Sequence, residues 1–291
     1  MLGDKRWIAG VCAALGLAAG TAAHSQADPA DWPGRFVESF ETRQAITDFP
    51  ATMPWPRAYR LQGALVERLM PQYGPVAGYK AALTGPGQRQ RFAVEQPVWG
   101  VLLAQTLSPN GSTIDGDFGV APFIEGDFIV RVGSAAINTA ADRMDVLAQL
   151  DAVVPFLELV DLPVRSEQGM NLPGLIAGNT GARKGLLGEP VPIAASEAWM
   201  ERLGAIEVIL YENGREVSRG TTTALYGHPV DAVIWLRDAL AEQGISLKAG
   251  DLLSLGSVAG GMHKLGRGTT IRADYHGLVD DGTVSVSGQV E

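Results

Sequence analysis

The sequence predicts an α+β protein, in which a helical N-terminal segment precedes a mainly β body that carries further helices. The chain has 36 Gly and 17 Pro among 291 residues and many short apolar runs, which disfavours a helical bundle. From Val76 onward the spacing of apolar residues shortens from a helical to a strand period. With 46% apolar and 19% charged residues, the chain can bury a core and is not a disordered sequence.

The first 27 residues have the layout of a secretory signal peptide. Lys5 and Arg6 precede the uncharged apolar stretch 7–19, and small residues follow as far as Ala27. The stretch is shorter than the roughly 20 residues that a membrane-spanning helix needs. We therefore expect 1–27 to be a signal peptide and the protein to be periplasmic or secreted; the alternative is a buried N-terminal helix. Removal would also take away Cys12, the only cysteine, so the mature chain would form no disulfide.

The charge balance argues against two classes of partner. The formal net charge is −9, and no basic run is longer than two residues. A nucleic-acid surface needs clustered Lys and Arg, so we expect no nucleic-acid partner. After removal of the signal peptide we expect no membrane association either.

Helical periodicity dominates the segment before residue 76. Residues 33–73 are predicted to be helical, with Leu61, Leu65 and Leu69 on one stripe. Pro71 and Gly74 are expected to end this helix. The expected organisation is a helical N-terminal cap over 28–75 and a body over 76–291.

The body alternates strands with two helices. Apolar and alternating runs predict strands, and Asn213-Gly214 predicts a two-residue hairpin turn because both residues tolerate positive φ. The expected strands are 122–132, 153–160, 251–255, 270–274 and 283–290, the hairpin is 205–222, and the helices are 139–150 and 230–242.

Three carboxylates in apolar strands are the main chemical signal. Glu125 and Asp127 are two residues apart, so they share one face of a strand, and Glu158 lies in a second apolar run. Buried unpaired carboxylates are costly, and a divalent cation would remove that cost. An all-oxygen donor set favours Mg²⁺, then Mn²⁺ or Ca²⁺. The alternative is a solvated strand face on which Glu125 and Asp127 pair with bases such as Arg131.

Two further features bear on chemistry. Lys80 lies in an apolar run, where a depressed pKa would suit an acid–base or carboxylate-binding role; the alternative is a surface lysine whose stem lies on the fold. The Gly-rich segment 256–261 either brings backbone N–H groups to a ligand anion or forms a tight turn. No Gly-x-Ser-x-Gly elbow and no Walker A loop are present, so a serine hydrolase and a P-loop nucleotidase have no support.

In their order along the chain, several segments resemble the 2-keto-4-pentenoate hydratase branch of the fumarylacetoacetate hydrolase superfamily. The resemblance covers about residues 35–290. It is carried by Ala77-Gly78-Tyr79-Lys80-Ala81-Ala82-Leu83-Thr84, Gln96-Pro97-Val98-Trp99-Gly100, Ile124-Glu125-Gly126-Asp127, Pro155-Phe156-Leu157-Glu158-Leu159-Val160, Asn179, Gly227-His228-Pro229 and Gly250-Asp251-Leu252-Leu253.

The resemblance implies a fold, a cofactor and a set of roles. The fold would be a fumarylacetoacetate hydrolase-like mixed β-sandwich roll with a helical N-terminal cap, assembled as a homo-oligomer. Mg²⁺ or Mn²⁺ would be held by Glu125, Asp127 and Glu158, with Asp127 in place of the usual second Glu. Lys80 would be the catalytic lysine. Substrate contacts would come from Thr84, Asn179 and Ser257.

The chain also departs from the family pattern. Val98 stands where the hydratases carry an Asp implicated in proton transfer, which leaves Glu95 or ordered water as the candidate donor. Ser254-Leu255-Gly256 replaces Leu-Thr-Gly, so a substrate hydroxyl contact is either lost or moved to Ser254 or Ser257. Ala177 stands in place of another Asp.

Two functional hypotheses follow from the resemblance and its departures. In the first, the protein is a lyase, a divalent-metal-dependent hydratase acting on a small 2-oxo or 2-hydroxydienoic acid through a metal-stabilised enolate. Decarboxylation and C–C hydrolysis proceed through the same enolate and stay open. In the second, the protein is an exported relative that binds a small oxo acid without turnover, which Val98 would favour.

Overall fold

The computed structural model of the protein describes residues 31–167 and 169–291. The expected signal peptide over 1–27 lies outside the described residues, so export stays a prediction. Residues 31–291 form one compact unit, and a division into cap and body at residue 75 therefore also stays a prediction. Within the described part of the chain, no helix combines the length and the apolar character that crossing a membrane requires.

Two helices, not one, occupy residues 31–75. They are α1 (Trp32–Thr42) and α2 (Trp55–Tyr73), separated by an irregular stretch. α1 begins where the side chain of Asp31 accepts the backbone N–H of Gly34, and it ends at Arg43 in the left-handed conformation. Pro71 does not end α2 as expected: it lies in the last turn, where the missing N–H removes only one helical hydrogen bond. Gly74, with φ +78°, follows the last residue of the helix.

The larger of two sheets places the candidate site. Its strand order is β2-β1-β11-β5-β6-β7-β3, with β12 paired to β5 and β8 paired to β6. The pairs β1–β11 and β3–β7 are parallel, and the others are antiparallel. Its strands are β1 (Val76–Ala82), β2 (Val98–Leu103), β3 (Leu107–Pro109), β5 (Pro122–Val132), β6 (Leu150–Asp161), β7 (Ala182–Leu187), β8 (Val191–Pro192), β11 (Leu252–Ser257) and β12 (His263–Lys264).

The smaller sheet has the order β10-β9-β13-β14-β4 and contains the predicted hairpin. Asn213 and Gly214 have φ of 51° and 75°, as a two-residue turn with both central φ angles positive requires. Its strands are β4 (Thr113–Ile114), β9 (Glu207–Glu212), β10 (Arg215–Thr221), β13 (Thr269–His276) and β14 (Thr283–Val290).

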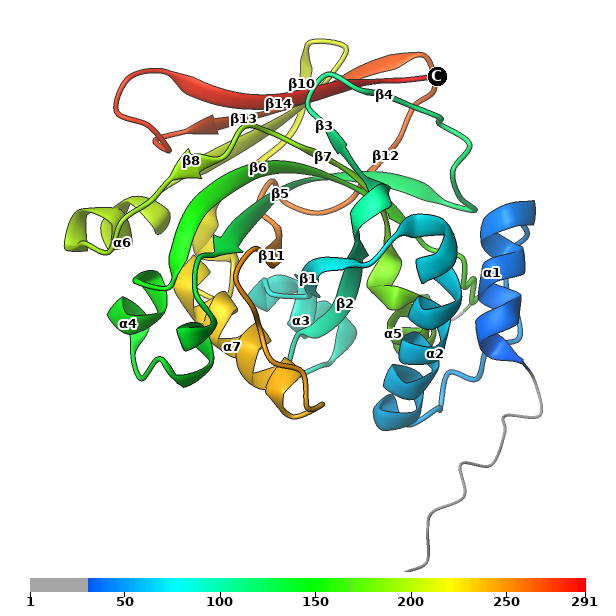
Figure 1. Ribbon diagram of the computed structural model, residues 1–291. Helices are drawn as coiled ribbons and strands as arrows, with labels where there is room; N and C mark the ends of the chain where they lie inside the picture. The colour runs from blue at the N-terminus through cyan, green and yellow to red at the C-terminus, as the bar shows by residue number, and fades with distance from the viewer. Residues whose placement is uncertain (1–30, 168) are drawn as a thin grey trace, which may run out of the picture. The chain divides into compact units, whose positions relative to one another are not determined.

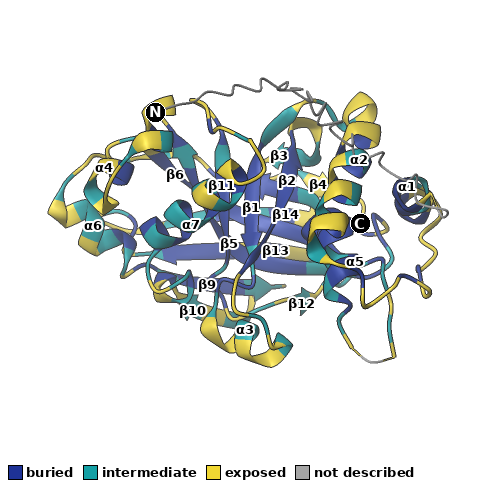
Figure 2. Ribbon diagram, turned by 90° about the horizontal axis from the view of Figure 1, so that it is seen from below, coloured by how far each residue is buried: buried dark blue, intermediate teal, exposed yellow. Residues whose placement is uncertain are grey.

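The smaller sheet covers one face of the larger one, and helices lie on the other side (Figure 1). A Cβ added at Gly126 of β5 would lie 3.2 Å from Val208 of β9, so this position of β5 faces the smaller sheet. Tyr275 of β13 joins the two layers, because its hydroxyl donates to the carbonyl oxygens of Asp127 and Phe156. The central strands are buried, whereas the outer faces of the helices are exposed (Figure 2).

The remaining helices are short except for α7. They are α3 (Pro86–Phe92), α4 (Arg143–Leu147), α5 (Leu172–Ala177), α6 (Glu197–Leu203) and α7 (Pro229–Ala241). The helix predicted over 139–150 is reduced to α4. The carboxylate of Asp142 accepts the N–H of Asp145 at 2.9 Å and so starts the helix there, after a separate 3₁₀ turn over Ala135–Thr139.

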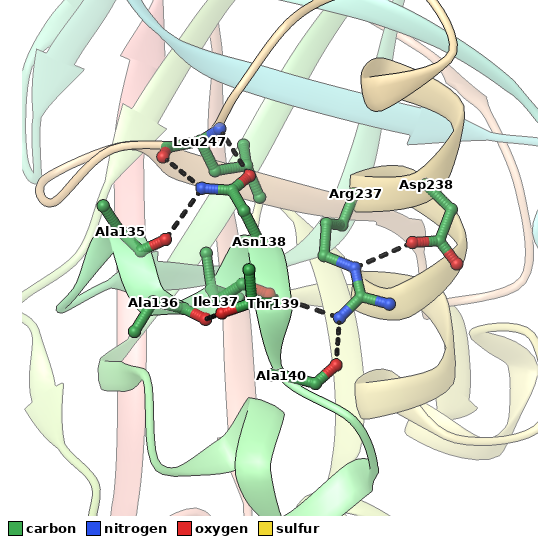
Figure 3. A network of polar contacts seen from close by, with 9 residues as sticks. All are labelled: Ala135, Ala136, Ile137, Asn138, Thr139, Ala140, Arg237, Asp238 and Leu247. Carbon is green, nitrogen blue, oxygen red and sulfur yellow. Dashed lines mark hydrogen bonds and ion pairs between the residues drawn. The ribbon is translucent and has the colours of Figure 1, made fainter.

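A polar network fastens that 3₁₀ turn to α7 and to the loop before β11 (Figure 3). The amide of Asn138 donates to Leu247 O at 2.7 Å and accepts from Leu247 N at 2.9 Å. The guanidinium of Arg237 on α7 donates to Ile137 O and Ala140 O. We call the residues drawn in Figure 3 the Asn138 network.

Candidate functional site

Strands β5 and β6 bring together the three predicted carboxylates, which we call the acidic trio. Glu125 lies directly opposite Glu158 in the antiparallel register, and Asp127 lies two residues further along β5. One carboxylate oxygen from each of Glu125, Asp127 and Glu158 lies within 4.8 Å of the others. Glu125 and Asp127 lie 33 and 31 residues before Glu158, a separation that is uninformative in the sequence, and strand pairing brings them together.

The acidic trio is buried rather than solvated. Glu125, Asp127 and Glu158 are 8%, 0% and 1% exposed, so the alternative of a solvated strand face is wrong. Arg131 pairs instead with Asp151, at 2.6 Å on the protein surface. Because Gly126 faces the smaller sheet and side chains alternate along a strand, Glu125 and Asp127 face the opposite side of the larger sheet.

Lys80 joins the acidic trio from β1. Its Nζ lies 2.6 Å from Oε1 of Glu158, and its side chain is 2% exposed, so it is not a surface lysine. The expected depression of its pKa is also wrong. Burial lowers the pKa of Lys80, but attraction to Glu158, Glu125 and Asp127 outweighs burial and raises it. These acids therefore favour the ammonium form of Lys80, which can donate hydrogen bonds.

One lysine does not neutralise three carboxylates. Burial, and next repulsion by Glu158, raise the pKa of Glu125 to about 7, although Lys80 opposes the shift. Burial and Glu158 also raise the pKa of Asp127 well above its usual range, against the hydrogen bond from Ser254. Among the described residues, Oε2 of Glu158 is buried without a hydrogen-bond partner. The donor set and this unpartnered oxygen fit a hard divalent cation.

Ser254 positions one member of the acidic trio. Its register places it beside Lys80 on the parallel strand β11, and its hydroxyl donates to Oδ2 of Asp127 at 2.7 Å. The other oxygen of Asp127 accepts the N–H of Phe128. The sequence suggested Ser254 as a substitute contact for a substrate hydroxyl, and that role stays a prediction beside the contact with the carboxylate. The parallel pairing that brings Ser254 to the site has no local signal in the sequence.

A cavity of about 260 Å³, which we call the inner cavity, opens beside Lys80 and Glu125. Ser257 also lines it, and Oγ of Ser257 has no hydrogen-bond partner among the described residues. Gly256, Gly260 and Gly261 complete that side of the cavity. A Cβ at Gly256, where φ is +103°, would lie 2.6 Å from Oγ1 of Thr84, so this loop requires glycine there. The Gly-rich segment thus turns tightly and borders the cavity, and contact of its backbone N–H groups with a ligand anion stays a prediction.

The other predicted substrate contacts are buried residues outside the lining of this cavity. The amide of Asn179 accepts from Val101 N at 2.7 Å and donates to Val101 O at 2.9 Å, which ties it to β2. Thr84 is 1% exposed and packs under Gly256. Neither side chain lines the inner cavity, so their roles in substrate binding stay predictions.

The position that lacks the family acid is apolar and closed. Val98 on β2 is fully buried and pairs with Ala82 of β1. Glu95, the candidate replacement donor, is exposed and does not line the inner cavity. Within the described chain, Lys80 is the protonated group that lines this cavity next to the acidic trio.

Sequence reasoning missed the second half of the cavity. An outer cavity of about 420 Å³ shares Arg91, Phe92 and four other lining residues with the inner cavity. Arg165 also lines it, from the loop after β6. Arg91 follows the Lys80 motif closely, but nothing in its local sequence distinguishes it from a surface arginine.

Comparison with known proteins finds relatives and a shared fold, although no family model matches the chain. The 4-oxalocrotonate decarboxylase of Pseudomonas putida is 25% identical over 242 residues, covering 83% of this chain and 89% of the relative. A 2-keto-4-pentenoate hydratase of Dechloromonas aromatica is 25% identical over 226 residues, covering 77% and 81%.

Solved structures agree with these relatives. The 4-oxalocrotonate decarboxylase of Pseudomonas putida G7, complexed with magnesium and adipate, matches with a TM-score of 0.76 and 24% identity, covering 89% of this chain and 96% of that one. A Yersinia pestis protein described under the fumarylacetoacetate hydrolase family matches with a TM-score of 0.52 and 16% identity, covering 75% and 93%. The α+β fold of that superfamily is thus confirmed, and the resemblance to its hydratase branch is supported by relatives named as hydratases and decarboxylases.

Proposed function

We propose that the protein is a divalent-metal-dependent, hydratase-like lyase that acts on a small 2-oxo or 2-hydroxydienoic acid. The observation that carries this proposal is the buried acidic trio, whose oxygens lie within 4.8 Å of one another beside a cavity. Relatives named as hydratases support the reaction class. A related structure that contains magnesium supports the cofactor.

The acidic trio would hold Mg²⁺ or Mn²⁺ through Glu125, Asp127 and Glu158. A bound cation would supply Lewis-acid chemistry, stabilising the negative charge that develops on the 2-oxo group of the substrate. Ser254 would keep the Asp127 carboxylate turned toward the cation. This support is the more important because Asp is one methylene shorter than the usual Glu.

Lys80 would act as the proton donor. Its ammonium group lines the inner cavity and lies 2.6 Å from Glu158, which fixes where Nζ points. A protonated lysine donates a hydrogen bond to a substrate oxygen or a proton to a carbon of the dienol. The free hydroxyl of Ser257 would orient a polar group of the substrate or the attacking water.

Decarboxylation is the second candidate, and a specific observation favours it. The P. putida decarboxylase matches this chain over 242 residues, against 226 for the D. aromatica hydratase, and the decarboxylase structure from P. putida G7 matches with a TM-score of 0.76. Both reactions need charge stabilisation at the same 2-oxo group, so the acidic trio alone does not separate them. A third candidate is binding without turnover, favoured by Val98 in place of an acid.

The experiment combines metal loading with two assays. Protein stripped with EDTA and reloaded with Mg²⁺ should consume 2-hydroxypenta-2,4-dienoate, followed as loss of dienol absorbance, if it is a hydratase. Release of CO₂ from 4-oxalocrotonate would identify the decarboxylase. Tight oxalate binding without either activity would identify the binding protein.

Two variants make this experiment specific. Glu125→Ala should lose stoichiometric Mg²⁺, measured by metal analysis, together with any turnover. Lys80→Gln should keep the metal ligands and lose turnover. If Glu125→Ala retained the metal content of the unmodified protein, the metal site would be elsewhere and the proposed function would fall.

A further inference from the structure

The inner and outer cavities adjoin each other. They share Arg91, Phe92, Leu162, Met170, Leu175 and Met262. A ligand chelated at the acidic trio would therefore extend past Arg91 into the outer cavity. The walls between are largely apolar, which suits a carbon chain and leaves the charged groups to define its two ends.

The far end of this space is cationic. Arg91 borders both cavities, and Arg165 borders the outer one. Within the described residues, neither guanidinium forms an ion pair with an acidic side chain; the ring of Phe92, 5.6 Å from Arg91, is the contact found for these two groups. Many other arginines of the described chain pair with Asp or Glu.

One acidic residue also borders the outer cavity, but it does not cancel that charge. Asp161 is 1% exposed, and its Oδ1 accepts the backbone N–H of Ala121 at 2.7 Å. Burial raises the pKa of Asp161 despite several backbone hydrogen bonds and the attraction of Arg183. Two exposed guanidinium groups, those of Arg91 and Arg165, thus border the outer cavity against one buried carboxyl group.

We propose that Arg91 and Arg165 bind a second carboxylate of the substrate, so that the protein selects dicarboxylic 2-oxo acids over monocarboxylic ones. The inference rests on the proposed function, because it assumes that the 2-oxo end lies at the acidic trio. A guanidinium group matches a carboxylate with two parallel hydrogen bonds, which makes arginine the appropriate residue for this end. Arg91 and Arg165 are thus specificity-determining residues and take no part in proton transfer.

The test measures binding and does not depend on turnover. Isothermal titration calorimetry of the Mg²⁺-loaded protein would compare 2-oxoadipate with 2-oxohexanoate, and 2-oxoglutarate with 2-oxopentanoate. Each pair has the same chain length and differs in the distal carboxylate. A charged hydrogen-bonded contact predicts that the diacid of at least one pair binds about 10-fold to 100-fold more tightly. Raising the salt concentration should narrow the preference.

Two variants and a control locate the effect. Arg91→Gln and Arg165→Gln should each weaken diacid binding about tenfold or more while leaving the monoacids unchanged. Arg60→Gln removes the same charge from the exposed surface of α2, away from both cavities, and should change neither. Thermal unfolding of all three variants would verify that they are folded.

The outcomes separate this inference from the function on which it rests. Equal affinity for diacids and monoacids in both pairs would overturn the inference and leave the metal site intact. Equal weakening of both kinds of acid by the arginine variants would also overturn it, because the arginines would then act through the fold. If no 2-oxo acid bound the Mg²⁺-loaded protein, the proposed function would fail together with the inference.

Discussion

Two polar clusters of this protein differ in how completely their hydrogen-bonding groups are paired. In the Asn138 network, the amide oxygen and nitrogen of Asn138 both bond to backbone, and no side-chain atom of the network is among the buried unpartnered atoms found in the described chain. At the acidic trio, Oε2 of Glu158 and Oγ of the neighbouring Ser257 are buried without partners.

The contrast separates polar groups that hold the fold from polar groups that await a ligand. Asn138 and Arg237 satisfy carbonyls that the 3₁₀ turn and the loop before β11 leave open. The acidic trio instead concentrates repelling charges that Lys80 offsets only in part. The free-energy cost of burying repelling carboxylates is retained in a fold when a bound ligand offsets it.

The largest expected effect on stability comes from replacing Lys80, the cationic side chain that pairs with the acidic trio. Lys80→Met should lower the free energy of unfolding of the metal-free protein by about 3–5 kcal/mol, because it leaves Glu158 buried without its partner. Urea unfolding at neutral pH with EDTA would measure the loss. Lys184→Met is the matched control: Lys184 is half-buried and lies against the ring of Phe118. Equal losses in the two variants would contradict the special role of Lys80.

The second effect is a pH dependence that the Asn138 network does not share. The pKa of Glu125 in the folded, metal-free protein is raised from 4.5 to about 7, so the folded state binds more protons than the unfolded state between these values. Stability from this group is therefore fully present below pH 4.5 and is lost as pH rises through 7, by on the order of 3 kcal/mol. Denaturant midpoints across this range would measure it. Glu125→Gln should flatten the profile, and an unchanged slope in that variant would assign the dependence to another group.

The third expected effect is stabilisation of the protein by a metal ion that offsets the charge repulsion within the acidic trio. Mg²⁺ at a hundredfold excess over its dissociation constant should stabilise the protein by about 2.7 kcal/mol, seen as a rise in the thermal midpoint. Glu125→Gln should remove most of this rise, because it removes a charged ligand. A full rise in that variant would show that Mg²⁺ stabilises the protein through a different site.

The smallest expected effect on stability concerns the Asn138 network, whose polar groups are paired. Asn138→Ala should cost about 1–2 kcal/mol, since it leaves the backbone groups of Leu247 without their partner. The same variant should keep the Mg²⁺-dependent rise in thermal midpoint in full, because the network is separate from the acidic trio. Loss of that rise would mean that the two clusters are coupled, against the contrast drawn here.

The amino-acid sequence by itself determined the α+β class, most strands of the body, the Asn213-Gly214 turn and the identity of the acidic trio. These features have local signals: alternation in Pro122–Val132, a turn dipeptide with positive φ, and acids placed in apolar runs. The ends of helices were determined less well, as Pro71 and the shortened α4 show, because capping and packing decide where a helix stops.

The tertiary structure alone decided how the residues of the site meet. The pairing of β5 with β6 placed Glu125 opposite Glu158, and the parallel pairing of β1 with β11 brought Lys80 to Ser254. That assembly reversed the expected shift in the pKa of Lys80, since the attraction of three acids outweighs burial. It also joined Arg91 and Arg165 along one cavity. Charge interactions depend on distance in space, which separation along the chain does not encode.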